Sequence, residues 1–370
     1  MSTAERYLSD EEIQLFIEET KLEPQYFYGV EGREYGVCPF ITFYVYHHDE
    51  DFLPLADKMI QIHQTMEGMI DIPYQMVWKD STQKWFKAGS KRLPDDLHAE
   101  AEKAKHKAEL FWIQATDMER PSASACWAIQ AIVTDCSPME YSTLKITFRH
   151  SWYLQNKQQW HEFILNCLRL LEPEQCYSGY EIGTTGTGVI GAYESDVMER
   201  ICADFFYGLD IDHPAKMGFQ YNRDEDGWIN PSRLGAGLRP PTWCFLLSPI
   251  WLKKLGLDEA AVRRQLDHPK ITITALPRSD GDTSLWIQLG ELDLYPVEDG
   301  LPELPVLANR LIRPVRCDDL NLTTLDPWED DPNPRFDFIS GPRWMGRFDP
   351  DSDWPSPIGR HSAQPPSTNP

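Results

Sequence analysis

The sequence predicts an α+β fold with a largely antiparallel sheet and helices packed against it. Segments with strand periodicity and segments with helical periodicity follow one another without the strict alternation that builds a parallel sheet. Hydrophobic residues make up 41% of the 370-residue chain, and its 13 Trp, 15 Tyr and 16 Phe can fill a substantial core. Two strand–helix pairs recur with similar spacing, which favours two related units although no residue-level repeat is visible.

The N-terminal part predicts a helix followed by the first strand–helix unit. Ser9 and Glu12 form the pattern of a capping box, so a short helix is expected to begin after Ser9. Residues 39–46 (PFITFYVY) are β-branched and aromatic, as expected of a strand. Apolar residues then recur at helical spacing after Pro54, and they are Leu55, Met59, Ile62 and Met66.

The middle of the chain predicts a second unit of the same kind. Residues 95–115 are charged and rich in alanine, which predicts a helix. The mostly apolar run that starts at Cys126 predicts a strand, and residues 143–150 (TLKITFRH) alternate as a strand does. A helical apolar stripe follows, formed by Trp160, Phe163, Ile164, Cys167, Leu168 and Leu171.

Strands and helices continue through the C-terminal half. Residues 243–247 (WCFLL) predict a strand, and a helix opened by Pro249 and closed near Gly256 follows it. Two further strands are predicted at 270–276 and 284–291, with a turn between them at 278–282. A helix that begins with proline is predicted at 302–312.

Composition divides the chain into one α+β domain, residues 1–325, and a C-terminal arm, residues 326–370. Between Asp326 and Asp353 acidic residues outnumber arginines, and many prolines and aromatic residues lie among them. Disordered tails carry few aromatic residues, so we expect an extended arm whose rings pack on the body of the protein. The last ten residues are expected to be loose.

The charge balance indicates the kind of partner. The chain has 58 acidic and 35 basic residues and a formal net charge of −23, which argues against direct binding of nucleic acid or anionic membranes and suits a basic partner. The eight cysteines form no C-x-x-C pair, and several lie at apolar positions, which favours reduced core thiols. No secretory signal or membrane-spanning segment is recognisable, so we expect a cytoplasmic protein.

Three glycines spell the pattern of a dinucleotide-binding turn. Gly186, Gly188 and Gly191 match G-x-G-x-x-G, and a predicted helix follows them. That turn requires a buried parallel strand running into its first glycine, whereas the residues before Gly183 (CYSGYEI) include few strongly apolar ones. We therefore favour a loop in which chain segments pass closely, and keep as an alternative a nucleotide-binding enzyme that uses the 183–191 glycine loop.

No other motif points to catalysis or to a bound metal. In the HHDED run, residues 47–51, His47 and His48 would point to opposite faces of a strand, so a solvated turn is favoured over a metal site. The sequence holds no H-E-x-x-H, G-x-S-x-G or P-loop pattern. We therefore expect a protein that is not an enzyme and has no catalytic residues, no cofactor and no metal.

Three blocks of the sequence resemble a known family. They are GLRPPTWCFLLSPIWLKKLG at 237–256, FFYGLDIDHP at 205–214 and SLWIQLGELDLYPVEDGLPELPVLANRLIRPVR at 284–316. Together they resemble the recurring blocks of the bacterial type VI secretion immunity family, and residues 39–69 show a weaker likeness. The chain departs from that family where Leu257 replaces a second glycine, and the arm after Asp326 lies outside the pattern.

The resemblance implies an immunity protein, an antitoxin that neutralises the cell's own copy of an injected effector toxin in interbacterial competition. Such a protein needs no catalytic residues, and a charge of −23 suits a basic, cytoplasm-acting nuclease whose active site it would block. The other alternative is a secretion-associated adaptor or chaperone. The candidate partner-binding residues combine an aromatic ring with carboxylates or lie at a strand end, and they are Trp328, Glu329, Asp330, Asp331, Asp49, Glu50 and Asp51.

Overall fold

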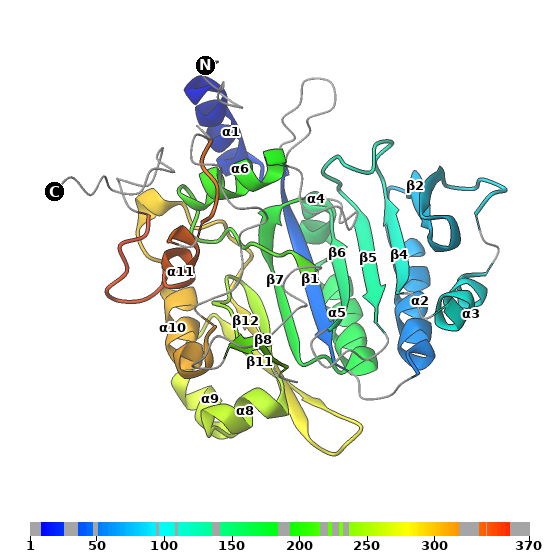
Figure 1. Ribbon diagram of the computed structural model, residues 1–370. Coiled ribbons are helices and arrows are strands. Elements are labelled where there is room, and N and C mark those ends of the chain that lie inside the picture. Colours follow the sequence, from blue (N-terminus) through cyan, green and yellow to red (C-terminus); the bar gives the residue numbers. More distant parts are fainter. Residues whose placement is uncertain are drawn as a thin grey trace.

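The centre of the molecule is one ten-stranded sheet with helices on both faces (Figure 1). The computed structural model describes residues 9–25, 36–46, 51–93, 96–107, 110–134, 141–183, 193–214, 221–223, 229–231, 237–317, 333–337 and 339–355. The strand order is β11-β12-β10-β7-β1-β6-β5-β4-β2-β3, and all neighbouring strands are antiparallel. The predicted α+β class with a largely antiparallel sheet is therefore confirmed.

The elements of the sheet and its covering layers have the following bounds. The sheet contains β1 (Val37–Val45), β2 (Met76–Lys79), β3 (Lys84–Lys87), β4 (Phe111–Thr116), β5 (Ala128–Val133), β6 (Ser142–Thr147), β7 (Gln175–Ile182), β10 (Cys244–Leu247), β11 (Ile271–Pro277) and β12 (Thr283–Leu289). A separate ribbon pairs β8 (Tyr221–Arg223) with β9 (Ile229–Pro231). The helices are α1 (Asp10–Leu22), α2 (Leu53–Glu67), α3 (Leu97–Lys107), α4 (His150–Gln155), α5 (Lys157–Leu171), α6 (Tyr193–Ala203), α8 (Pro249–Leu255), α9 (Glu259–Gln265), α10 (Glu303–Ile312) and α11 (Ser340–Met345). Short 3₁₀ helices lie at η1 (Asp80–Thr82), η2 (Val297–Asp299) and η3 (Arg313–Val315).

The sheet separates two apolar cores, one on each face. In the first core, Ile41 and Phe43 of β1 belong to the same cluster as Trp160 of α5 and residues of α2 and α4. The second core contains Tyr44 of β1 and Trp251 of α8, together with residues of α1, α6 and α10. Because successive side chains of a strand point to opposite faces, β1 contributes to both cores, and all of its residues are buried.

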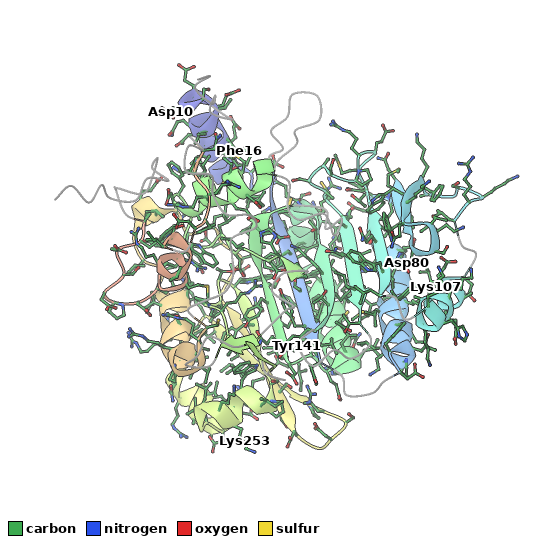
Figure 2. The ribbon with its side chains drawn as sticks, viewed as in Figure 1. Asp10, Phe16, Asp80, Lys107, Tyr141 and Lys253 are labelled. Atoms are coloured by element: carbon green, nitrogen blue, oxygen red, sulfur yellow. The ribbon has the colours of Figure 1, made fainter. Side chains whose placement is uncertain are left out.

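Local sequence signals set the ends of several helices. The Glu12 amide donates to Ser9 Oγ at 3.3 Å and the Ser9 amide donates to Glu12 Oε2 at 2.8 Å, so the predicted capping box of α1 is confirmed. Phe16 of this helix, labelled in Figure 2, is buried in the second core. The helix α8 begins at Pro249 and is closed by Gly256, whose φ is 66°, as predicted.

Both predicted strand–helix units are present and lie side by side. The strand β1 leads into α2, and β6 leads into α4 and α5. The two strands are antiparallel neighbours with Ile41 opposite Ile146, and α2 contacts α5. The two units therefore share the first core.

The prediction of a helix over residues 95–115 is wrong for the C-terminal part of that range. The helix α3 ends at Lys107, and β4 begins at Phe111, which pairs with Val133 of β5. The charged, alanine-rich part does form the helix, in which Ala101 and Ala104 are buried. The aromatic and β-branched residues from 111 onward bury more apolar surface in the sheet, and this tertiary gain overrides local helix propensity.

The C-terminal segment packs against the second core. Phe336, Trp344, Phe348 and Trp354 are no more than 5% exposed and belong to the same apolar cluster as α10. The Trp354 indole N–H also donates to the carbonyl of Ala203 in α6 at 3.1 Å. These rings pack on the body as predicted, although α11 makes part of the segment helical instead of extended. The domain boundary between residues 325 and 326 stays a prediction.

The described cysteines behave as reduced core residues. Cys38, Cys167, Cys176, Cys202 and Cys244 are free and buried, and burial raises the pKa of each thiol above its ordinary value. In the part of the chain that the structure describes, no helix has the length and apolar character needed to cross a bilayer.

Asp117 gives the fold a pH dependence that can be measured. This residue follows β4 and is 5% exposed. Burial raises the pKa of its carboxyl from 3.8 to about 6, although hydrogen bonds from the backbone amides of Trp127 and Cys126 oppose the shift. Between these two pH values the folded protein keeps a proton that the unfolded chain loses. Stability therefore falls as the pH rises through this window.

We expect Asp117→Asn to be more stable than the wild type at pH 7 and to lose this advantage as the pH falls to 4. A shift from 3.8 to about 6 corresponds to about 3 kcal/mol in the free energy of unfolding at neutral pH. Urea denaturation between pH 4 and pH 7 measures the effect, and Asp267→Asn at an exposed carboxyl controls for the change in net charge. Equal pH dependence of Asp117→Asn and the wild type would contradict the assignment.

Candidate functional site

The strand β7 runs directly into the glycine-rich stretch. All of its residues, Gln175–Ile182, are buried, although few of them are strongly apolar. The polar residues that hid this strand are buried with partners: Glu181 pairs with Lys145, and the Ser178 hydroxyl donates to a backbone carbonyl of β1. A strand can therefore be fully buried without an apolar sequence when its polar groups are paired inside.

The neighbours of β7 differ from those in a dinucleotide-binding fold. Both β1 and β10 pair with β7 in the antiparallel direction, whereas the dinucleotide turn joins strands of a parallel sheet. The three glycines themselves, Gly186, Gly188 and Gly191, lie outside the described residues. The topology thus removes the structural context that the nucleotide alternative requires.

Residues 205–213 cross between β7 and the turn that follows β12. The Gly208 amide donates to the carbonyl of Leu294 at 2.7 Å, and the Asp210 amide donates to a carbonyl of β7 at 2.6 Å. A Cβ on Gly208 would lie 2.4 Å from the nearest backbone carbonyl oxygen, so a larger residue does not fit unless the backbone moves. Because residues 205–213 pass this close to the neighbouring backbone, Asp210 and Asp212 lie next to the sheet.

Asp212 is the centre of a buried polar network. Its carboxylate accepts hydrogen bonds from the hydroxyls of Thr42 and Tyr44, the second at 2.8 Å, and lies 2.7 Å from the Arg239 guanidinium. Burial acts to raise the pKa of Asp212, but Arg239, Lys145 and the two hydroxyls outweigh it, so the pKa lies below its ordinary value. The carboxylate therefore stays charged in the interior.

Lys145 and Glu181 form an ion pair that reaches across β1. The Lys145 Nζ lies 2.6 Å from Glu181 Oε2 and 2.6 Å from the backbone oxygen of Asp212, and it sits 5.5 Å from the centre of the Phe40 ring. The side chains of Lys145 and Glu181 are 5% and 1% exposed. Burial acts to lower the pKa of Lys145, but the carboxylates of Glu181 and Asp212 outweigh it and raise that pKa. The ammonium group thus also stays charged.

Arg239 joins this network to the block at residues 237–256. Its guanidinium donates to the carbonyl of Ile211 at 2.7 Å, lies 3.5 Å from Asp210 Oδ2 and stacks 4.2 Å from the centre of the Tyr177 ring. The network therefore connects the three central strands β7, β1 and β6 with residues 205–213 and with the loop that carries Arg239. Two cations, Lys145 and Arg239, thus lie among the carboxylates of the network, which is the arrangement expected of a group that fixes a fold.

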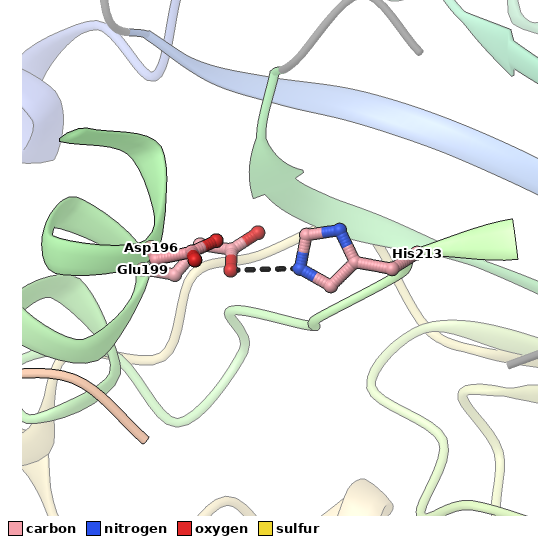
Figure 3. A group of neighbouring side chains, drawn as sticks. All are labelled: Asp196, Glu199 and His213. Carbon is pink, nitrogen blue, oxygen red and sulfur yellow. Dashed lines mark hydrogen bonds and ion pairs between the residues drawn. The ribbon is translucent and has the colours of Figure 1, made fainter. Parts of the chain in front are cut away.

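A second polar cluster lies next to this network. Asp196 and Glu199, three residues apart on α6, face His213, and the Glu199 Oε2 lies 2.9 Å from His213 Nε2 (Figure 3). One ligand atom from each of the three residues lies within 4.8 Å of the others. These side chains are those of a site that could hold a metal ion.

Most of the predicted partner-binding residues lie outside the described residues. These are Asp49, Glu50, Trp328, Glu329, Asp330 and Asp331. Asp51 is described: its Oδ1 accepts from the Leu53 amide at 3.0 Å just before α2, and its Oδ2 lies 2.9 Å from Lys105 Nζ. The Asp51 side chain remains 49% exposed, so it can still face a partner.

Sequence reasoning missed the charged residues of both clusters. Lys145 stands between two apolar residues of a strand, and Glu181 stands in a strand that is wholly buried. A charged residue between apolar residues of a predicted strand could have indicated them, because such a side chain needs a partner inside the protein. No sequence pattern indicated which residue that partner would be.

Comparison with known proteins identifies relatives of the chain. The family described as "TsiV: Type VI immunity for VRR-NUC" matches residues 73–348, which is more than half of the chain. Among solved structures, the Pseudomonas aeruginosa T6SS protein PA0821 is similar, with a TM-score of 0.66 and 17% sequence identity over 86% of this chain and 84% of that one. This likeness is one of fold. No curated protein matches at a significant level.

We expect Lys145→Met to lower the free energy of unfolding by about 3–5 kcal/mol, because it leaves the Glu181 carboxyl buried without its ammonium partner. The double variant Lys145→Met/Glu181→Leu should lose less than the sum of the single variants. Urea denaturation of the three variants and the wild type measures this coupling. Lys157→Met is the control, since the pair between Lys157 and Glu291 is 40% and 74% exposed and should contribute at most about 1 kcal/mol. Purely additive losses would show that the buried pair is not coupled.

Proposed function

Since the chain belongs to the family of type VI immunity proteins for VRR-NUC, we propose that it binds and neutralises a cognate type VI secretion effector with a nuclease domain of the VRR-NUC kind. The observation that carries this proposal is the family match over residues 73–348, which includes Lys145, Glu181, Asp212 and Arg239 of the buried network. The similar Pseudomonas aeruginosa structure is that of a T6SS protein, and this likeness supports a role in the same kind of secretion system.

The charge of the chain supports a nuclease as the partner. A nuclease binds a polyanion and therefore carries a basic cleft, while this chain has a formal net charge of −23. Opposite charges steer two proteins toward each other and raise the rate of association. Because the DNA substrate of such an effector lies in the cytoplasm, the immunity protein has to meet its target there.

We further propose that inhibition blocks the active site of the effector with acidic and aromatic side chains. The segments Trp328–Asp331 and Asp49–Asp51 are the proposed contacts, since each concentrates carboxylates, and the first adds an indole ring. Asp51, at the N-terminus of α2, presents about half of its side chain to solvent. Carboxylates of this kind can occupy the positions that DNA phosphates take in a basic cleft.

Co-expression with the cognate effector tests the proposed function. Cells that carry the effector alone should die or stop growing, and cells that carry both proteins should grow. An effector with an inactivated nuclease site controls for general toxicity. Growth arrest despite co-expression, or survival of cells that lack this chain, would overturn the proposal. Protection against several unrelated effectors would favour an adaptor or chaperone instead.

Charge reversal tests the proposed contacts. We expect Asp330→Lys/Asp331→Lys and Asp49→Lys/Glu50→Lys each to raise the concentration needed for half-inhibition of the purified nuclease about tenfold or more, as expected when close charge pairs are lost. Glu102→Lys/Asp267→Lys makes the same change in net charge at two exposed acids and should inhibit like the wild type.

Competition with DNA separates the two modes of inhibition. If this chain blocks the active site, a short DNA duplex should compete with it for the effector, and the apparent affinity should fall as DNA is added. Binding that is unaffected by saturating DNA would place the interface on a remote surface, even where co-expression protects the cell.

A further inference from the structure

Three metal-ligating side chains converge where α6 meets the segment that crosses the sheet. Asp196 and Glu199 lie on one face of α6, because residues three apart in a helix are neighbours. His213 is the last residue of the crossing segment, residues 205–213, and turns its imidazole toward both carboxylates (Figure 3). Among the residues that the structure describes, these three form a group in which one ligand atom from each residue lies within 4.8 Å of the others.

We propose that Asp196, Glu199 and His213 bind a divalent transition-metal ion, with Zn²⁺ as the best-fitting case. Zinc accepts carboxylate oxygens and imidazole nitrogens at about 2.0–2.2 Å, which puts ligand atoms about 3.4 Å apart in a tetrahedral site. Glu199 Oε2 and His213 Nε2 are 2.9 Å apart, and one ligand atom from each of the three residues lies within 4.8 Å of the others, which is compatible with that spacing. A water molecule would complete the coordination.

The chemistry of the ligands selects among metals. An imidazole nitrogen beside two carboxylates suits Zn²⁺ and, with lower affinity, Mn²⁺, whereas Ca²⁺ and Mg²⁺ prefer oxygen ligands alone. The ligands are removed from bulk water: Asp196 and Glu199 are 7% and 3% exposed, and the His213 side chain is 10% exposed. A dication between two carboxylates would compensate charges that are costly to bury.

The position of the cluster indicates what the ion would do. Its ligands join α6 to the segment that places Asp212 in the buried network, and α6 follows directly on the glycine-rich stretch at 184–192. Burial lowers the pKa of Lys145, and the Glu199 carboxylate is close enough to that network to help raise it, after the nearer carboxylates of Glu181 and Asp212. The ion would therefore link α6 to the sheet and stabilise the fold without a catalytic part. The sequence predicted no metal because its ligands fall in no recognised spacing.

Titration of the chelator-treated full chain with ZnCl₂ tests the site. We expect one Zn²⁺ per chain by calorimetry and by elemental analysis after dialysis. Asp196→Asn, Glu199→Gln and His213→Gln should each lower the affinity at least about tenfold. Saturating Zn²⁺ should raise the Tm of the wild type by about 3 °C or more and leave that of the variants unchanged.

A second histidine–carboxylate pair provides the matched control. His268 Nε2 lies 3.8 Å from Glu303 Oε1 on the surface, so His268→Gln removes a similar pair and should leave Zn²⁺ binding intact. Circular dichroism of the zinc-free variants checks that they fold. If they do not fold, Co²⁺ added to the wild type should give the visible absorption of a low-coordinate site. Absence of stoichiometric Zn²⁺ or Co²⁺ uptake by the wild type, or binding retained in all three folded variants, would overturn the proposal.

Discussion

The pairing of buried charges at the centre of the sheet is the constraint on which the rest of the structure depends. Lys145 and Glu181 lie on two strands that flank β1, and their side chains are almost wholly buried. Each ion loses its hydration on folding, and only a close opposite charge with further hydrogen bonds offsets that loss. Asp212 supplies such a bond, because its backbone oxygen accepts from Lys145, and Arg239 in turn pairs with the Asp212 carboxylate. The segments that carry these two residues must therefore be held on the sheet to within hydrogen-bond distance.

This requirement gives a physical meaning to the sequence blocks that identify the family. The block with Asp212 and the block after β12 meet at a bridge between Phe206 and Pro296, which the close crossing at Gly208 permits. The block with Arg239 meets the end of the block at 284–316 at a bridge between Leu238 and Arg316. Gly208 therefore serves a close backbone approach that helps to bring distant charges together.

A rigid interior of this kind suits a protein that works by binding. An inhibitor that is already ordered loses less conformational freedom when it meets its target, so more of the contact energy appears as affinity. The charge network occupies the interior, so the surface can match the shape and charge of a partner. The proposed ion at Asp196, Glu199 and His213 would extend the same principle to α6, since it would tie this helix to the network through the neighbouring residue Asp212.

The sequence by itself determined the parts of the structure that depend on neighbouring residues. The capping box at Ser9, the two central strand–helix units, and the Pro249 and Gly256 ends of α8 follow from signals within a few positions. The tertiary structure decided where α3 gives way to β4, that β7 is buried, and which charges meet. Lys145 and Glu181 are 36 residues apart, and the Thr42–Asp212 contact spans 170. Such pairs exist only because the antiparallel sheet brings their strands together, and this long-range pairing leaves no local pattern to read.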